Sequence, residues 1–106
     1  MVRLNVLYPN SEGLRFDHDY YRDKHMPLVA DRLGSACLYY QVDRGLAGGA
    51  PGAPPPYIAS CSIVCESGES LQKALAQHAP EILADIKNYT DAQPVIWVSA
   101  VVVERS

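Results

Sequence analysis

Hydrophobic and polar positions along the chain predict two halves with the same order of elements: strand, helix and strand. In the first half, Asp17 is typical of a helix N-cap, Phe16 before it is placed to act as a hydrophobic staple, and Gly34 is typical of a helix end. Between them, apolar residues recur at steps of three and four, which is the period of a helix face. These patterns predict a strand over residues 2–8, a helix over 17–33 and a strand over 36–43.

The second half repeats this order. Ser67 or Gly68 opens a helix whose inward stripe consists of Leu71, Ala74, Leu75, His78, Ile82 and Ile86. The flanking strands are predicted over residues 57–65 and 94–103. Two split strand–helix–strand units of this kind predict an α+β, ferredoxin-like βαββαβ fold, with a four-stranded antiparallel sheet and both helices on one face. We expect one domain over residues 1–106, in which the Gly-, Ala- and Pro-rich segment 44–56 is a mobile loop.

Each predicted helix contains a His-x-Pro triplet, at residues 25–27 and 78–80. Proline lacks an amide donor and clashes with the carbonyl four residues earlier, so each helix is expected to kink there. In the first helix the kink would loosen the packing around His25 and leave room for a ligand.

The last predicted strand is apolar on both of its faces. Val95, Trp97, Val101 and Val103 alternate with Ile96, Val98, Ala100 and Val102, and only Ser99 interrupts the pattern. Helices on one side can cover only one face of a four-stranded sheet, so an apolar residue set on the other face indicates an interaction surface. The simplest way to cover it is a two-fold homodimer that pairs the same sheet face with itself.

Composition and charge exclude several functional classes. The chain has 9 Lys and Arg against 12 Asp and Glu, and its third predicted strand carries no basic residue, so a nucleic-acid-binding module is not expected. No apolar run approaches the ~20 residues of a membrane span, and residues 1–5 do not resemble a signal peptide. Three cysteines cannot form a closed disulfide framework, which favours reduced thiols in a cytoplasmic protein.

His25 is the first candidate for acid–base chemistry. It shares the inward face of its helix with Tyr21, one turn before, and Val29, one turn after. Partial burial would lower the pKa of the imidazole and keep it neutral at pH 7, so that it can accept a proton from a bound acid or return one. The alternative is that His25 is a core histidine satisfied by one hydrogen bond.

Other residues extend the candidate site, although each of them also has a purely structural interpretation. Arg32 continues the face of His25, His78 lies on the stripe of the second helix, and aromatic side chains are suited to a flat or apolar ligand. The expected binding residues are Tyr20, Val29, Arg32, His78 and Trp97. The three histidines have no ligand-like spacing, so we expect no metal site.

The stretch LYPNSEGLRFDHDYYRDKHMPLV, residues 7–29, resembles the EthD family, named for ethyl tert-butyl ether degradation. Phe16, the Tyr20-Tyr21 pair and His25 with the Pro-Leu that follows carry the resemblance, which continues through residues 84–96. It implies a dimeric α/β barrel that binds ligands between sheet and helices. It also implies chemistry without a metal or organic cofactor, of oxidoreductase, isomerase or dehydratase type, with His25 as the functional histidine and Tyr21 as its aromatic neighbour.

Three functions remain open at this point. The first is a cofactor-free enzyme acting on a small apolar or aromatic metabolite, with His25 as acid–base and Tyr21 orienting a substrate oxygen. The second is an auxiliary protein of an oxygenase system that binds a hydrophobic ligand without turning it over. The third is a structural or regulatory dimer in which His25 only packs. Fold alone does not decide among them.

Overall fold

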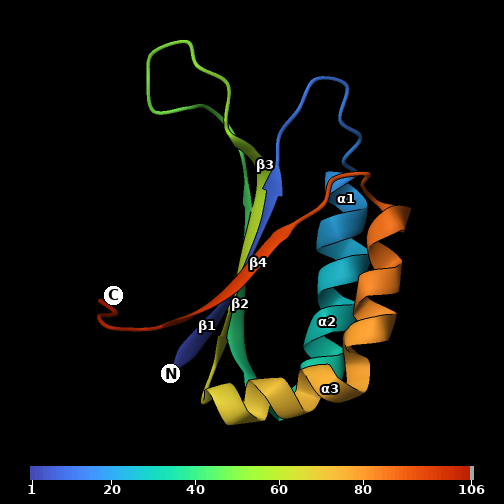
Figure 1. Cartoon of the computed structure of the whole chain (residues 1–106), viewed down its shortest axis with the longest axis vertical. Helices are drawn as coiled ribbons and strands as arrows, with labels where there is room; N and C mark the ends of the chain where they lie inside the picture. The colour runs from blue at the N-terminus through green and yellow to red at the C-terminus, as the bar shows by residue number, and fades with distance from the viewer. Residues whose placement is uncertain (106) are drawn as a thin grey trace.

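Four strands form one antiparallel sheet in the computed structural model, which describes residues 1–105 (Figure 1). The strands are β1 (Val2–Pro9), β2 (Cys37–Arg44), β3 (Tyr57–Cys65) and β4 (Val95–Ala100). Their order across the sheet is β2-β3-β1-β4, so β1 and β3 are central and β2 and β4 are the edges. The predicted ferredoxin-like fold is confirmed.

Helices cover one face of this sheet (Figure 1). The first helical stretch consists of α1 (His18–Tyr20), the π-helical turn η1 (Tyr21–His25), α2 (Met26–Leu33) and the 3-10 turn η2 (Gly34–Ala36). The second consists of α3 (Gly68–Asp85) and the 3-10 turn η3 (Ile86–Asn88). No helix within residues 1–105 combines the length and the apolar character needed to cross a membrane.

The helix ends follow the sequence signals. The side chain of Asp17 accepts a hydrogen bond of 3.0 Å from the Tyr20 amide, and the Phe16 ring packs edge-on against Tyr21. Ser67 caps α3 in the same way, with a 3.1 Å bond from the Ser70 amide. These side chains satisfy amides that have no partner within their own helix, which fixes where each helix begins.

The first helix widens at the turn that carries His25. The amide of Met26 donates to the carbonyl of Tyr21, five residues back, which defines η1 as a π turn. Pro27 cannot donate to the carbonyl of Asp23, and its ring disfavours an α-helical carbonyl at that position. A wider turn just before Pro27 accommodates both restrictions, so the helix contains a π turn where the sequence suggested only a kink.

The second helix, α3, is strongly bent between its first and second halves (Figure 1). It contains Pro80 in its interior, which removes one backbone hydrogen bond. The bend allows the second half of α3 to run beside the first helical stretch (Figure 1). Its last residue, Asp85, is thereby brought to the level of η1.

The last strand is shorter than predicted. The sequence indicated residues 94–103, whereas β4 ends at Ala100. Ala100 is paired with Val2, the first residue of β1, and the next amide, of Val101, donates to the Met1 carbonyl. Beyond Ala100, β4 has no further residue of β1 to pair with. Apolar residues alone cannot continue a strand that has no neighbouring strand to bond.

Candidate functional site

An apolar cavity of about 230 Å³ lies between the sheet and the helices. It is lined from the sheet by Leu4, Val6, Tyr8, Cys61, Ile63 and Ile96, and from the helices by Tyr21, His25, Met26, Val29, Leu75, Ala79, Ile82, Leu83 and Ile86. Among the described residues, this lining contains no Lys, Arg, Asp or Glu. Leu83 and Ile96 are about half exposed and mark the side on which the cavity opens.

His25 forms the polar part of this wall. The residue lies on η1 and is only 3% exposed. The ring stacks on Tyr21, with 5.6 Å between centroids and 16° between planes, and lies 4.6 Å from the ring of Tyr89. His25 is thus held between two aromatic rings beside an apolar space.

Asp85 holds one nitrogen of that imidazole. Its Oδ2 lies 2.9 Å from His25 Nδ1, while its Oδ1 accepts hydrogen bonds from the Tyr20 hydroxyl at 2.7 Å and from the side-chain Nδ2 of Asn88 at 2.9 Å. Burial by itself would raise the pKa of Asp85, but the bonds donated by Asn88, His25 and Tyr20 outweigh burial and lower it. The carboxylate is therefore ionised at neutral pH.

The charge state of His25 follows from two opposing effects. Burial lowers its pKa most strongly, and the hydrogen bond and negative charge of Asp85 raise it, so that the net pKa lies below the ordinary value for histidine. His25 is neutral at pH 7. Because an ionised carboxylate can only accept, the proton of the neutral ring belongs on Nδ1. The hydrogen bond to Asp85 is the one that the ring makes within residues 1–105, so Nε2 keeps its lone pair.

The side chains of Tyr8, Tyr21 and Tyr89 pack against one another, and their hydroxyls form a second polar feature of the site. Those of Tyr8 and Tyr89 bond each other at 2.6 Å, whereas the buried hydroxyl of Tyr21 makes no well-aligned hydrogen bond in the described part of the chain, although the Tyr8 hydroxyl and the Cys61 thiol lie near it. Burial is the main cause that raises the pKa of Tyr8 to about 12 and also raises the pKa of Tyr21. Both hydroxyls therefore remain protonated and can act as donors.

The structure brings together only some of the residues that the sequence singled out. His25, Tyr21 and Val29 line the cavity. Tyr20 does not line it but bonds Asp85 from the side. His78 is half-buried on α3 and is not among the lining residues, although its neighbour Ala79 is. Trp97 follows the lining residue Ile96 in β4, so it points to the opposite face of the sheet.

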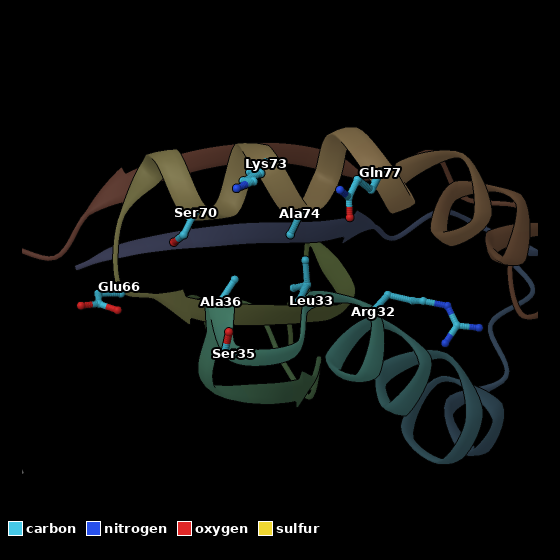
Figure 2. Close-up of a pocket in the computed structure, with 9 residues that line it drawn as sticks. All are labelled: Arg32, Leu33, Ser35, Ala36, Glu66, Ser70, Lys73, Ala74 and Gln77. Carbon is cyan, nitrogen blue, oxygen red and sulfur yellow. The ribbon is translucent and has the colours of Figure 1, made fainter.

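Arg32 lines a different, polar hollow between the first half of α3 and the segment that joins α2 to β2 (Figure 2). Its guanidinium donates to Glu81 and to Asp31, each at 2.5 Å. The positive charge is thus already paired with two carboxylates, and Arg32 is separate from the cavity of His25.

Sequence reasoning missed Asp85, Asn88 and Tyr89. Asp85 bonds the imidazole of His25, Asn88 bonds Asp85, and the ring of Tyr89 packs against the imidazole. All three lie 60 or more residues after His25 in the sequence. The available signal was the resemblance over residues 84–96, which contains all three. Periodicity gave no indication of them, because Asp85 is the last residue of its helix.

Comparison with known proteins identifies the family. The EthD domain model matches residues 12–93, a span that contains both His25 and Asp85. This chain belongs to the EthD family. No protein with a curated description matches it.

Solved structures support the EthD assignment. An EthD-like protein from Ralstonia eutropha JMP134 is 57% identical, over 99% of this chain and 95% of that one, with a TM-score of 0.95. An ethyl tert-butyl ether degradation (EthD) family protein from Bacillus halodurans C-125 is 21% identical, over 94% and 97% of the two chains, with a TM-score of 0.71. An antibiotic biosynthesis monooxygenase is 13% identical, over 97% and 100%, with a TM-score of 0.50, and shares the fold alone.

Proposed function

We propose that this EthD protein is a cofactor-independent enzyme that moves a proton on a small, uncharged organic molecule, with His25 as acid–base. The observation that carries this proposal is a buried imidazole, 3% exposed, in the wall of an apolar cavity, with Nδ1 engaged by Asp85. The lowered pKa of the ring supports it. General acid–base catalysis needs such a group within reach of the reacting proton and with a pKa near the working pH.

The cavity favours one class of ligand. An engineered cavity of roughly 150 Å³ can hold benzene, so about 230 Å³ suits one ring with short substituents. A charged ligand would have no counter-charge among the described lining residues and would lose its hydration. The hydroxyl of Tyr21 supports a role for that residue in orienting a substrate oxygen, because it stays protonated and has only the Tyr8 hydroxyl and the Cys61 thiol near it, with no well-aligned acceptor.

The proposed chemistry is proton abstraction from a phenol, enol or ketone. The resulting anion would then isomerise, lose water or react with oxygen, as in the isomerase, dehydratase and oxidoreductase types. The family's name, ethyl tert-butyl ether degradation, favours an apolar substrate in a degradative pathway. The three free thiols favour the cytoplasm as its location.

We also propose that the chain works as a homodimer joined through its sheets into an α/β barrel. The four residues Val95–Val98 on edge strand β4 are each 48–52% exposed, although all are large and apolar. An apolar strand open on both faces is typical of an interface. A partner placed there would also close the cavity on the side of Ile96.

Deuterium uptake from heavy water into the α-position of simple aryl ketones tests the acid–base proposal by NMR. The wild-type protein should accelerate the exchange, and His25→Gln should slow it by roughly 100-fold or more, because a positioned base contributes ~10²–10⁴. His18→Gln is the matched control, since His18 lies outside the lining, and should exchange at the wild-type rate. Equal rates for His25→Gln and wild type would remove His25 from the mechanism.

The second candidate is an auxiliary protein that binds a hydrophobic ligand without turnover. The apolar lining favours it, because binding alone needs only burial and shape. Saturable binding of the same ketones without exchange would support this candidate over the enzyme, and His25→Gln would then change affinity alone.

A further inference from the structure

We infer that Asp85 is a positioning residue that holds the proton of His25 on Nδ1, so that Nε2 meets the ligand as a base rather than as an acid. The inference rests on the proposed function and specifies which way the first proton moves. It starts from the 2.9 Å contact between Asp85 Oδ2 and His25 Nδ1.

Asp85 is itself held in place. Both donors to its Oδ1 are fixed by the fold: Tyr20 belongs to α1, and Asn88 lies three residues beyond Asp85 in η3. Oδ2 is left for His25 alone. The carboxylate therefore joins the two helical stretches, and its own orientation is set before any ligand enters.

No other charged side chain competes for the imidazole among the residues described. The aromatic and hydrogen-bonding partners of the ring are Tyr21 on η1, Tyr89 after η3 and Asp85 at the end of α3, and Asp85 is the one charged group that acts on its pKa. Burial keeps both tyrosines protonated. Asp85 is therefore the partner that decides which nitrogen of His25 carries the proton.

The consequence is a direction for the reaction. A C–H or O–H proton of the substrate would move to Nε2, and the electrons of the broken bond would remain on the substrate as an enolate or phenolate. His25 becomes an imidazolium, whose charge Asp85 stabilises, and the proton can then return to another substrate atom. The substrate class is thus an uncharged acid that gives a proton first, not a molecule that must first be protonated.

Substitution of Asp85 by asparagine gives a sharp test without any substrate. Tyr20 and Asn88 donate to Oδ1, so the oxygen of the new amide should stay on their side and its NH₂ should face His25 Nδ1. Nδ1 must then accept, and the ring proton moves to Nε2. Loss of the same kind of orienting carboxylate in a serine protease leaves the wrong tautomer and lowers kcat by ~10⁴.

The measurement is the ¹⁵N–¹H spectrum of the histidine rings above the pKa of His25. The chain has three histidines, and His25→Gln assigns the signal. We expect the Nδ1–H tautomer in the wild type and the Nε2–H tautomer in Asp85→Asn, which should also have a lower His25 pKa because the negative charge is gone. Asp43→Asn, an exposed substitution of the same kind on β2, should match the wild type.

An Nε2–H tautomer in the wild type would overturn the inference even if Asp85→Asn failed to fold. An unchanged tautomer in a folded Asp85→Asn protein would also overturn it. Either result leaves the proposed function standing if ketone exchange still depends on His25. Conversely, an Nδ1–H ring in a protein that exchanges no ketone would confirm the orientation and reject the enzyme.

Discussion

At the residue scale, the imidazole of His25 combines deep burial with a partner of opposite charge. A fully isolated buried histidine would titrate well below neutrality and would be a poor base, whereas a strongly paired one would stay protonated. In His25 burial is the larger effect and Asp85 opposes it. The ring therefore stays neutral at pH 7 while its imidazolium form remains accessible.

This balance predicts that acid destabilises the fold through His25. Its pKa is lower in the folded state than in the unfolded chain, so below the unfolded value of 6.5 the unfolded state binds more protons. The contribution of His25 to the free energy of unfolding should be constant above about pH 7 and fall as the pH drops from 6.5 toward the folded pKa. Urea unfolding between pH 8 and 5 measures this decrease.

His25→Gln provides the comparison for that titration. Glutamine does not ionise, so the variant should lose less stability than the wild type between pH 7 and pH 5. Parallel curves for the two proteins would mean that folding leaves the pKa of His25 unchanged. Asp85 acts in a lower range, because its own pKa is lowered and its contribution disappears only in stronger acid.

The sequence could place His25, Tyr21 and Val29 on one face, and all three line the cavity, but it gave no sign of the residue that bonds His25. The three lie within two turns of one helical stretch, where helical spacing alone places side chains on a common face. Asp85 meets His25 across 60 residues of sequence, through a bent helix and the packing of two helical stretches. A contact of that kind depends on tertiary geometry, which no local pattern encodes.

At the scale of elements, most ends of helices and strands could be predicted from the sequence, because the residues at those ends determine them. Caps, glycines and alternation fix where strands and helices begin, and β3 has the predicted bounds. Two features were not predictable. The π turn differs from an α turn by one residue in its hydrogen bonding, and the end of β4 is set by the length of β1 rather than by its own composition.

The first helical stretch should depend measurably on its N-cap. Asp17→Ala removes the acceptor of the Tyr20 amide and should lower the free energy of unfolding by about 1 kcal/mol. Asp17→Asn keeps a capping oxygen and should cost much less. Urea unfolding of both variants checks this.

Equal losses for the two variants would show that the charge of Asp17, rather than its hydrogen bond, stabilises the helix. Tyr20, whose amide is capped, also bonds Asp85. Fraying of this first turn in Asp17→Ala should therefore broaden the NMR signals of His25 as well.

At the scale of the whole molecule, the helices cover the centre of the sheet more completely than its edges. Ile63 on central strand β3 is 2% exposed, whereas Ile96 on edge strand β4 is 48% exposed, although both line the same cavity. The apolar surface continues from the cavity onto the edge of the sheet. This continuity is the reason to expect a partner at β4.

Sedimentation equilibrium at micromolar concentration tests the dimer. We expect a mass of twice 11.6 kDa for the wild type and a shift toward the monomer for Trp97→Lys, which places a charge on the exposed face of β4. Leu46→Lys, on the exposed loop between β2 and β3, is the control and should sediment as the wild type. A wild-type mass of 11.6 kDa would contradict the dimer.

The second half of α3, which follows the bend, cannot tolerate a change in length. One additional residue between Pro80 and Asp85 would rotate the carboxylate by about 100° around the helix axis and turn it away from its imidazole. The segment 45–56 extends beyond the sheet, where extra residues cost little loop entropy (Figure 1). Affinity tags, fluorophores and natural insertions therefore belong in that loop, whereas the final turns of α3 must keep their residue count.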